Sequence, residues 1–177
     1  MLSMTVAQET EFDLRREVRA GDPEAIIELH ERVYRPEYGM DARFVDGVRS
    51  TVERAVERGW PDGGGGWLVD GADGLVGSIG LTDEGDGLGQ VRWVVLAPEA
   101  RGIGMGRRMI TETVEEARRL GFERLELDTF GALKAAAAIY RGLDFKLVSE
   151  ERTEKWGPPI AYQHYVLDLR GEALSAT

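Results

Sequence analysis

The sequence contains no cysteine, only two histidines (His30 and His164) and only three lysines among its 177 residues. The missing cysteines exclude disulfide bonds and thiolate chemistry. Two histidines so far apart in the sequence argue against a histidine-based metal site, so we expect no bound metal. Each histidine is expected to be a hydrogen-bonded structural residue.

Long apolar runs are also missing. None approaches the roughly 18 residues that a membrane-spanning helix needs, so we expect no membrane association. The start of the chain, MLSMTVAQETEFD, lacks the charged beginning and apolar centre of a signal peptide, which predicts a cytoplasmic protein. The formal net charge of -10 argues against a nucleic acid partner. An acidic surface suits a cationic small molecule, although solubility alone also explains it.

What is present is enough apolar material for a core, because 42% of the residues are hydrophobic. The length suits one domain, which we assign to residues 11–170, with flexible tails at residues 1–10 and 171–177. Alternation and helical periodicity predict the element order β-α-α-β-β-β-α-β-α-β-β. The expected fold class is therefore α/β (α+β), with a mixed central sheet of about seven strands and helices on both faces.

Turn and capping residues place several of these elements. A first strand is predicted over residues 12–19, followed by a helix that Asp22 caps ahead of Pro23. Asp41 is predicted to cap the second helix, and a hairpin turns at residues 72–74. The run LGQVRWVVLAP is the most strand-like segment, and a helix is expected from about residue 104 to residue 120. The glycine-rich segment GWPDGGGG leads into a strand and is expected to be a plain loop.

A glycine-rich segment, PEARGIGMGRR, stands between that strand and the following helix. It lacks the lysine of a phosphate-binding P-loop and the third glycine of a dinucleotide fingerprint. It does match [RQ]-x-x-G-x-[GA] through Arg101, Gly104 and Gly106. Glycines bring bare N–H groups close to an anion, and the helix dipole adds partial positive charge. The segment is either a diphosphate-binding loop or a glycine-rich turn.

The strand, the loop, the next strand and the segment AAAAIYRGLDF together resemble the GCN5-related N-acetyltransferase (GNAT) family, which uses acetyl-CoA. The resemblance runs from about Val18 to Leu169 and is sharpest over VRWVVLAPEARGIGMGRR and AAAAIYRGLDFKLV. The segments LHERVYRPEYGMDARF and KWGPPIAYQHYVLDL also look like the acetyltransferase half of bacterial proteins fused to a winged-helix (MarR-type) regulator. Here we expect the acetyltransferase domain alone.

The resemblance implies a set of cofactor-binding residues. In the family, the strand before the loop splays from its neighbour and the pantetheine pairs with its backbone. The diphosphate lies on the loop amides, and arginines add charge-assisted hydrogen bonds. Carried over to this sequence, these positions are Val94, Val95, Leu96, Arg101, Gly102, Ile103, Gly104, Met105, Gly106 and Arg107.

The resemblance also assigns Tyr140 as the residue whose phenol protonates the departing CoA thiolate, the alternative being a packed core aromatic. Two positions depart from the family. The asparagine often found early in this helix is missing from GALKAAAA, and Asp144 replaces the usual glycine before the closing phenylalanine. Asp tolerates the left-handed conformation better than most residues, so we expect the turn to survive.

The general base is not assigned by the motif, because Gln90 stands where many members have a catalytic glutamate. Asp128 is the leading substitute, and Glu126, Asp86 and Glu84 are further candidates. The alternative is a water chain, since positioning is the main help that a neutral amine needs. We favour the water route.

The resemblance places Tyr34, Tyr38 and Trp156 over the acetyl end as acceptor-pocket candidates, with Glu37 and Asp41 able to attract a cationic amine. The expected function is direct acetyl transfer from acetyl-CoA to a primary amine of a small molecule or peptide. The alternatives are a non-catalytic acyl-CoA-binding regulatory domain and a transferase using another acyl or aminoacyl donor. A homodimer is left open.

Overall fold

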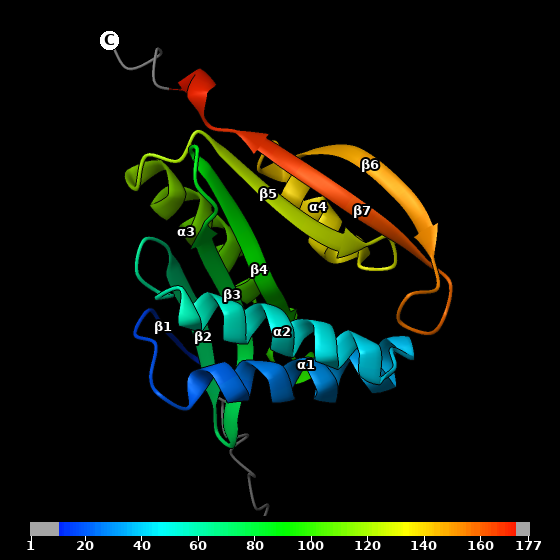
Figure 1. The fold of residues 1–177 in the computed structure, drawn as a ribbon. Helices are drawn as coiled ribbons and strands as arrows, with labels where there is room; N and C mark the ends of the chain where they lie inside the picture. The colour runs from blue at the N-terminus through cyan, green and yellow to red at the C-terminus, as the bar shows by residue number, and fades with distance from the viewer. Residues whose placement is uncertain (1–10, 173–177) are drawn as a thin grey trace, which may run out of the picture.

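The computed structural model describes residues 11–172, so the predicted N-terminal tail and residues 173–177 of the predicted C-terminal tail lie outside the described residues. The elements follow in the predicted order (Figure 1): β1 (Asp13–Arg15), α1 (Asp22–Tyr38), α2 (Ala42–Glu57), β2 (Gly65–Gly71), β3 (Gly74–Asp83), β4 (Leu88–Leu96), α3 (Met105–Arg119), β5 (Arg124–Phe130), α4 (Lys134–Gly142), β6 (Lys146–Thr153) and β7 (Ile160–Asp168). Short 3₁₀ helices at Pro98–Ala100 and Arg170–Glu172 complete the described chain.

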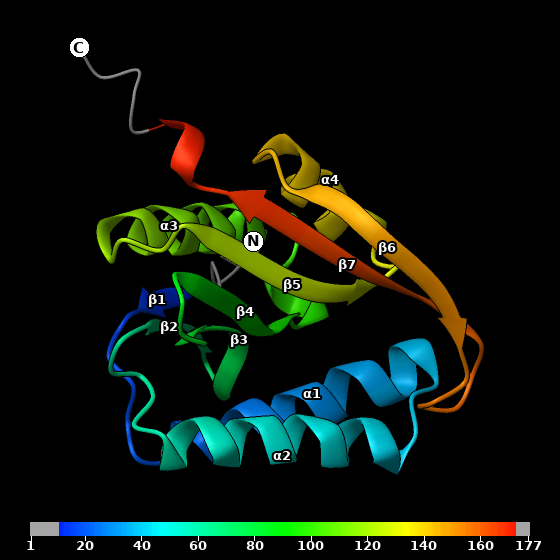
Figure 2. The same cartoon turned by 45° about the horizontal axis from the view of Figure 1, so that its top comes forward.

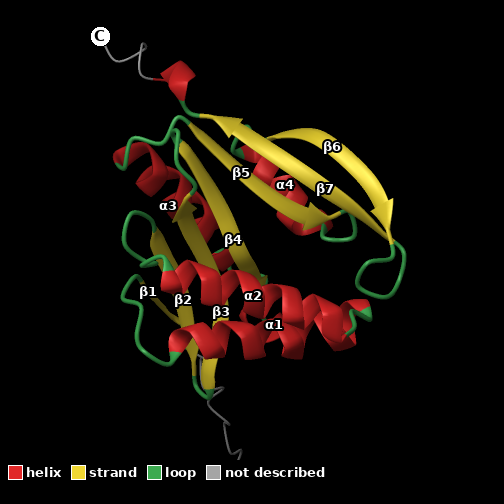
Figure 3. Cartoon of the chain, viewed as in Figure 1, coloured by secondary structure: helices red, strands yellow, loops and turns green. Residues whose placement is uncertain are grey.

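The seven strands form one sheet in the order β1-β2-β3-β4-β5-β7-β6. All neighbours are antiparallel except β4 and β5, which are parallel, so the predicted mixed sheet is confirmed. Helices α1 and α2 cover one face of the sheet, while α3 and α4 lie on the other (Figures 2 and 3). Strand β7 lies between β5 and β6, so residues near the C-terminus pair directly with β5.

Apolar side chains from both helix layers meet the sheet in one core. Trp67, Leu125 and Tyr165 are fully buried within it, and buried and half-buried residues alternate along β4. Within residues 11–172, no helix is long and apolar enough to cross a membrane.

Local signals at the helix ends were mostly predicted correctly. The Asp41 carboxylate accepts the N–H of Arg43 at the start of α2, and Gly104 precedes α3 in the left-handed conformation. Asp144 has a φ of 70°, which confirms that it adopts the left-handed turn that glycine usually fills.

The beginning of the chain differs from the prediction. Strand β1 ends at Arg15, because the following residues turn towards α1. The helix cap is Gly21, and Asp22 is the first residue of α1. Its carboxylate accepts the N–H of Arg19 at 2.6 Å and pairs with the Arg15 guanidinium at 2.7 Å. Asp22 therefore holds the turn before the helix and does not cap the helix itself.

Candidate functional site

The main cleft opens where β4 and β5 separate. Their pairing is limited to Leu88–Gln90 against Arg124–Glu126, after which the strands diverge (Figure 1). A cavity of about 1000 Å³ fills the divergence and is lined by parts of α1, α2, β4, β5, α4 and the loop before α3. The remaining β4 residues, 91–96, have no partner on β5, so their backbone edge faces this cavity.

A bulge in β4 accompanies the divergence. Trp93 has a φ of 51°, a left-handed conformation that is rare for a bulky residue, and the β3–β4 register shifts between Ser78 and Gly80. The carbonyl of Trp93 accepts the Ser78 hydroxyl at 2.6 Å, and its indole N–H donates to Thr51 at 2.9 Å. A Cβ at Gly80 would lie 2.3 Å from the Trp93 ring, so only glycine permits this arrangement.

Two side chains hold the free edge of β4. The Tyr34 hydroxyl donates to the Val94 carbonyl at 2.9 Å, and Nε of Arg101 donates to the Leu96 carbonyl at 2.9 Å. A carbonyl oxygen has two lone pairs, so each group can still accept a second hydrogen bond from a ligand. Val94, Val95 and Leu96 all line the cavity, as a pantetheine-binding strand would.

The glycine loop presents bare backbone to the same cavity. Gly102 and Gly104 both have a φ of 80°, and no atom lies within 4 Å of a Cβ built on either residue. Within residues 11–172, no carbonyl or side chain accepts a hydrogen bond from the consecutive N–H groups of residues 102–107. Free amides at a helix start are a ready anion site, so the loop fits a diphosphate group.

The side chains of this loop divide between the cavity and solvent. Met105, Gly106 and Arg107 line the cavity, whereas the side chain of Ile103 is exposed and leaves only its N–H for a ligand. Arg107 has no ion-pair partner among the described residues, which leaves its charge available to a phosphate.

Arg101 is already bound within the protein. Its two terminal nitrogens donate to both carboxylate oxygens of Glu37, one of them at 2.8 Å, and this contact lowers the pKa of Glu37. Because Glu37 is neutralised by Arg101, it is poorly placed to attract a cationic amine. Asp41, the other predicted attractor, caps α2 and pairs with Arg43 at 2.6 Å.

Tyr140 lies in α4 against Phe145 and Tyr165, with 2% of its surface exposed. It lines the cavity, and no described residue forms a hydrogen bond with its hydroxyl. Burial, with a smaller effect of Tyr165, raises the pKa of the Tyr140 phenol above its usual value. The phenol therefore keeps its proton at neutral pH and can donate it to a group in the cavity.

Asp128 lies on β5 opposite His164 of β7 and lines the same cavity. Nδ1 of His164 donates to the Asp128 carboxylate at 2.7 Å, while Nε2 lies 3.6 Å from Glu126. The side chains of Asp128 and His164 are 39% and 27% exposed. Burial raises the pKa of Tyr162, and the charge of Asp128 and a hydrogen bond to it add to this effect.

The pairing of His164 with Asp128 was not foreseen, because it depends on β7 lying beside β5. The prediction that both histidines are hydrogen-bonded is confirmed. His30 is bound through Nδ1 to the carbonyl of Ile26 at 2.7 Å. Burial lowers the pKa of His30 to about 4, so it is neutral at physiological pH.

The other candidate bases are less well placed than Asp128. Gln90 lines the cavity, but an amide cannot take a proton. Glu84 pairs with Arg92 at 2.9 Å and with Arg58 at 3.5 Å, and Asp86 lies in the β3–β4 turn away from the cavity. Among residues 11–172, no group of three or more acidic or histidine side chains is arranged to hold a metal ion.

The predicted acceptor residues Tyr34, Tyr38 and Trp156 all line the cavity within an aromatic cluster. Tyr34 is the most enclosed, since its ring packs on His30, Tyr38, Phe44 and Phe130 and its hydroxyl is bound to β4. Trp156 comes from the β6–β7 connection, and its carbonyl accepts the N–H of Asp41 at 2.9 Å. The β6–β7 connection thus contacts the α1–α2 connection beside this aromatic cluster.

Known proteins share this sequence pattern and this fold. The sequence model of the Acetyltransferase (GNAT) family matches residues 24–145. The uncharacterized N-acetyltransferase YjgM of Escherichia coli is 31% identical over 83 residues, covering 45% of this chain and 50% of that protein. The chain thus matches only half of the length of that curated relative.

Solved structures agree on the fold. A ribosomal-protein-alanine N-acetyltransferase from Brucella melitensis has a TM-score of 0.69 at 18% identity, covering 89% of this chain and 99% of the other. A phosphinothricin acetyltransferase from Sinorhizobium meliloti, solved with acetyl-CoA, has a TM-score of 0.67 at 21% identity, covering 94% and 93%. With the family model matched across most of the cleft-forming elements, this chain belongs to the acetyltransferase (GNAT) family.

Proposed function

We propose that this protein is an acetyl-CoA-dependent N-acetyltransferase that modifies a primary amine of a small molecule or peptide by direct transfer. The observation that carries the proposal is the divergence of β4 from β5 with a loop of free amides at the end of β4. A backbone edge and an anion site in one cavity match the amides and the diphosphate of CoA. With no cysteine in the chain, no acyl-cysteine intermediate can form.

The binding roles follow from the free groups in the cavity. The amides of residues 102–107 hold the diphosphate, with Arg107 adding charge. The backbone of Val94, Val95 and Leu96 pairs with the pantetheine amides. Arg101 acts indirectly, because it fixes the carbonyl of Leu96 and anchors the loop to α1 through Glu37.

Bound acetyl-CoA supplies an activated thioester: the acceptor nitrogen forms the new C–N bond, the C–S bond breaks, and CoA leaves as a thiol. Tyr140 holds a proton at its hydroxyl, because burial raises the pKa of the phenol further above that of a thiol. A thiolate is a weaker base than this phenolate, so the hydroxyl stabilises the departing sulfur by donating a hydrogen bond to it. A proton that Tyr140 passes to the sulfur as the C–S bond breaks is replaced from water.

Asp128 is the residue that we assign to the acceptor amine. Its carboxylate is fixed by His164 and can accept a hydrogen bond from the amine. An ordinary carboxylate is a far weaker base than an alkylamine, so it orients the amine while the ammonium proton passes to water. This assignment keeps the water route and gives Asp128 a positioning role beside it.

The test combines binding with turnover. Calorimetry with acetyl-CoA measures the first step, and thiol release over a panel of amino acids, polyamines, aminoglycosides and peptide N-termini measures the second. We expect binding and acceptor-dependent release. Failure to bind acetyl-CoA would refute the assignment of the cleft.

Acyl-CoA binding without catalysis is the second candidate function. It is favoured by Gln90, which stands where a carboxylate base is common in the family. Tight acetyl-CoA binding with no thiol release above the rate without acceptor, for every amine in the panel, would establish it. Release with other acyl-CoA donors but not with acetyl-CoA would instead identify a different acyl group.

A further inference from the structure

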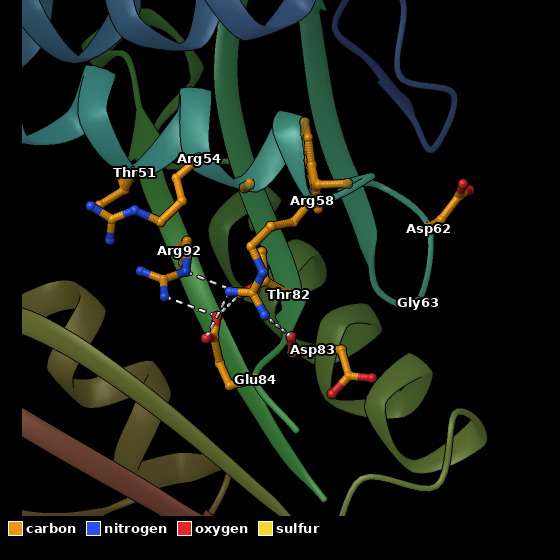
Figure 4. Close-up of a pocket in the computed structure, with 11 residues that line it drawn as sticks. Thr51, Arg54, Arg58, Asp62, Gly63, Thr82, Asp83, Glu84 and Arg92 are labelled. Atoms are coloured by element: carbon orange, nitrogen blue, oxygen red, sulfur yellow. Dashed lines mark hydrogen bonds and ion pairs between the residues drawn. The ribbon is translucent and has the colours of Figure 1, made fainter. Parts of the chain in front are cut away.

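A second pocket opens beside the acceptor side of the cleft. It has a volume of about 240 Å³ and is lined by α2, by the connection after α2, by the end of β3 and by Arg92 in the middle of β4 (Figure 4). Thr51 and Arg92 line both this pocket and the main cleft, so the two cavities are neighbours. A molecule whose amine lies in the cleft can therefore extend into the pocket.

Three arginines dominate this pocket: Arg54, Arg58 and Arg92. Glu84 pairs with Arg58 and Arg92 and accepts the Thr82 hydroxyl, but among the described contacts it does not pair with Arg54. One carboxylate oxygen of Asp83 accepts the N–H of Gly85. Asp62 also lines the pocket, but in Figure 4 it stands apart from the arginines.

Two guanidinium groups keep free N–H donors. Nε of Arg92 donates to Thr82 at 3.0 Å and Nη2 donates to Glu84 at 2.9 Å, so Arg92 is fixed in place while its Nη1 has no partner among the described residues. The Arg54 guanidinium has no hydrogen-bond or ion-pair partner within residues 11–172. In Figure 4, the side chains of Arg54 and Arg92 extend towards the same side.

The opposite wall of the cleft carries negative charge. Asp128 lies there, whereas Glu126 does not line the cleft and pairs with Arg124 at 3.1 Å. Arg92 is close enough to lower the pKa of Tyr162, which Asp128 raises. One end of the acceptor region thus carries a carboxylate. The other end combines three guanidinium groups with three acidic residues, and Arg54 and Nη1 of Arg92 are the donors left free there among the described residues. Free cationic donors stand out on a chain with a net charge of -10, which repels free anions elsewhere.

We propose that the acceptor is a small zwitterion, an amine that also carries a carboxylate, such as a free amino acid. Its ammonium or amine group faces Asp128, and its carboxylate binds between Arg54 and Arg92. Planar guanidinium groups match the geometry of a carboxylate and bind it with paired hydrogen bonds. This inference rests on the proposed function, since it names the substrate class for the same cleft.

The test compares matched acceptors that differ only in the carboxylate. L-Phenylalanine and L-methionine are each paired with their amino acid amides, and kcat/KM from thiol release is corrected for the fraction of neutral amine. We expect the carboxylate form to be preferred by about 10- to 100-fold, the value of a hydrogen-bonded charge. Equal kcat/KM for both members of each pair would overturn the inference while leaving acetyl transfer established.

Arg54→Gln is the decisive variant, because the Arg54 side chain makes no hydrogen bond or ion pair with the described residues that the substitution would break. It should remove most of the preference by lowering kcat/KM for the amino acids about 10-fold, with the amides unchanged. Arg49→Gln on the same helix is the control, since Arg49 pairs with Glu24 and lines neither the pocket nor the cleft. The inference is wrong if both variants weaken the amino acids equally, or if Arg54→Gln weakens amino acids and amides alike.

Binding gives a readout that does not depend on turnover. In calorimetry with the CoA-bound protein, L-phenylalanine should bind to the wild type and to Arg49→Gln, and about 10-fold more weakly to Arg54→Gln. If no amine in the panel is acetylated, the proposed function fails by itself. If the wild type also fails to bind L-phenylalanine, or if Arg54→Gln binds it as tightly as the wild type does, the proposed substrate class fails as well.

Discussion

Acidification should destabilise this protein through His30. The imidazole is buried in α1 with 3% of the residue exposed, and burial lowers its pKa to about 4. In the unfolded chain the same group has a pKa of about 6.5. The folded protein therefore binds fewer protons, so the contribution of His30 is complete above about pH 6.5 and is lost as the pH falls towards 4.

The loss of stability follows from the pKa values of His30 in the folded and unfolded states. The full difference between these pKa values corresponds to about 3 kcal/mol in the free energy of unfolding, and about 2 kcal/mol of it is lost between about pH 7.5 and pH 5. The loss also reaches the cleft, because the His30 ring stacks on Tyr34, whose hydroxyl holds the Val94 carbonyl. Acid should therefore weaken acetyl-CoA binding before the chain unfolds.

Urea unfolding at a series of pH values measures the loss, and His30→Gln isolates it from the carboxylates that titrate nearby. The variant starts from a lower stability but should lose about 2 kcal/mol less than the wild type over the same range. His30→Leu serves the same purpose if the glutamine variant does not fold. Parallel pH curves for wild type and both variants would refute the reasoning, as would an NMR titration in which the His30 ring protonates near pH 6.5.

Further substitutions test the cleft. Tyr34→Phe should lower the free energy of unfolding by about 1 kcal/mol by leaving the Val94 carbonyl without its donor; a selective rise in acceptor KM at unchanged stability would instead make Tyr34 an acceptor residue. Tyr140→Phe should cut turnover by roughly 10- to 10⁴-fold at nearly unchanged CoA affinity, and wild-type turnover would leave Tyr140 with a packing role only. Gly104→Asp should abolish CoA binding by placing a carboxylate among the loop amides, which calorimetry on the folded variant checks. Asp128→Asn should raise acceptor KM while the bend in log(kcat/KM) still follows the pKa of the amine; a bend that stays fixed across amines and vanishes in this variant would make Asp128 the base.

Local signals predicted the fold well because each depends on a few neighbouring residues. The cap at Asp41, the glycine loop around Gly104 and the left-handed Asp144 all follow from short-range backbone chemistry. The mixed sheet followed from the element order and from the resemblance to the GNAT family. The prediction of an Asp22 cap failed because Arg15 and Arg19 compete for the same carboxylate.

The arrangement of the site depended on contacts that are distant in sequence. Asp128 was a candidate on its own strand, but its partner His164 became visible only when β7 was placed beside β5. The Trp93 bulge requires Gly80 on the neighbouring strand, and neither residue alone predicts the bulge from the sequence. Arg101 was predicted to bind the cofactor and it lines the cavity, but the pairing of its guanidinium with Glu37 could not be foreseen, because the position of α1 depends on the packed sheet.

Because the pairing between β4 and β5 is short, the stability of this part of the sheet depends on the ligand that binds between the two strands. Beyond Gln90 the two edges share no described backbone hydrogen bonds, so a ligand that pairs with β4 completes a sheet that the chain leaves open. The amide hydrogens of residues 91–96 that are not bonded to β3 should exchange with solvent faster in the free protein than in the bound one. By mass action, ligand at one hundred times its Kd adds about 2.7 kcal/mol to the stability of the folded state. The amount of this protein that survives proteolysis should therefore rise and fall with the supply of its ligand.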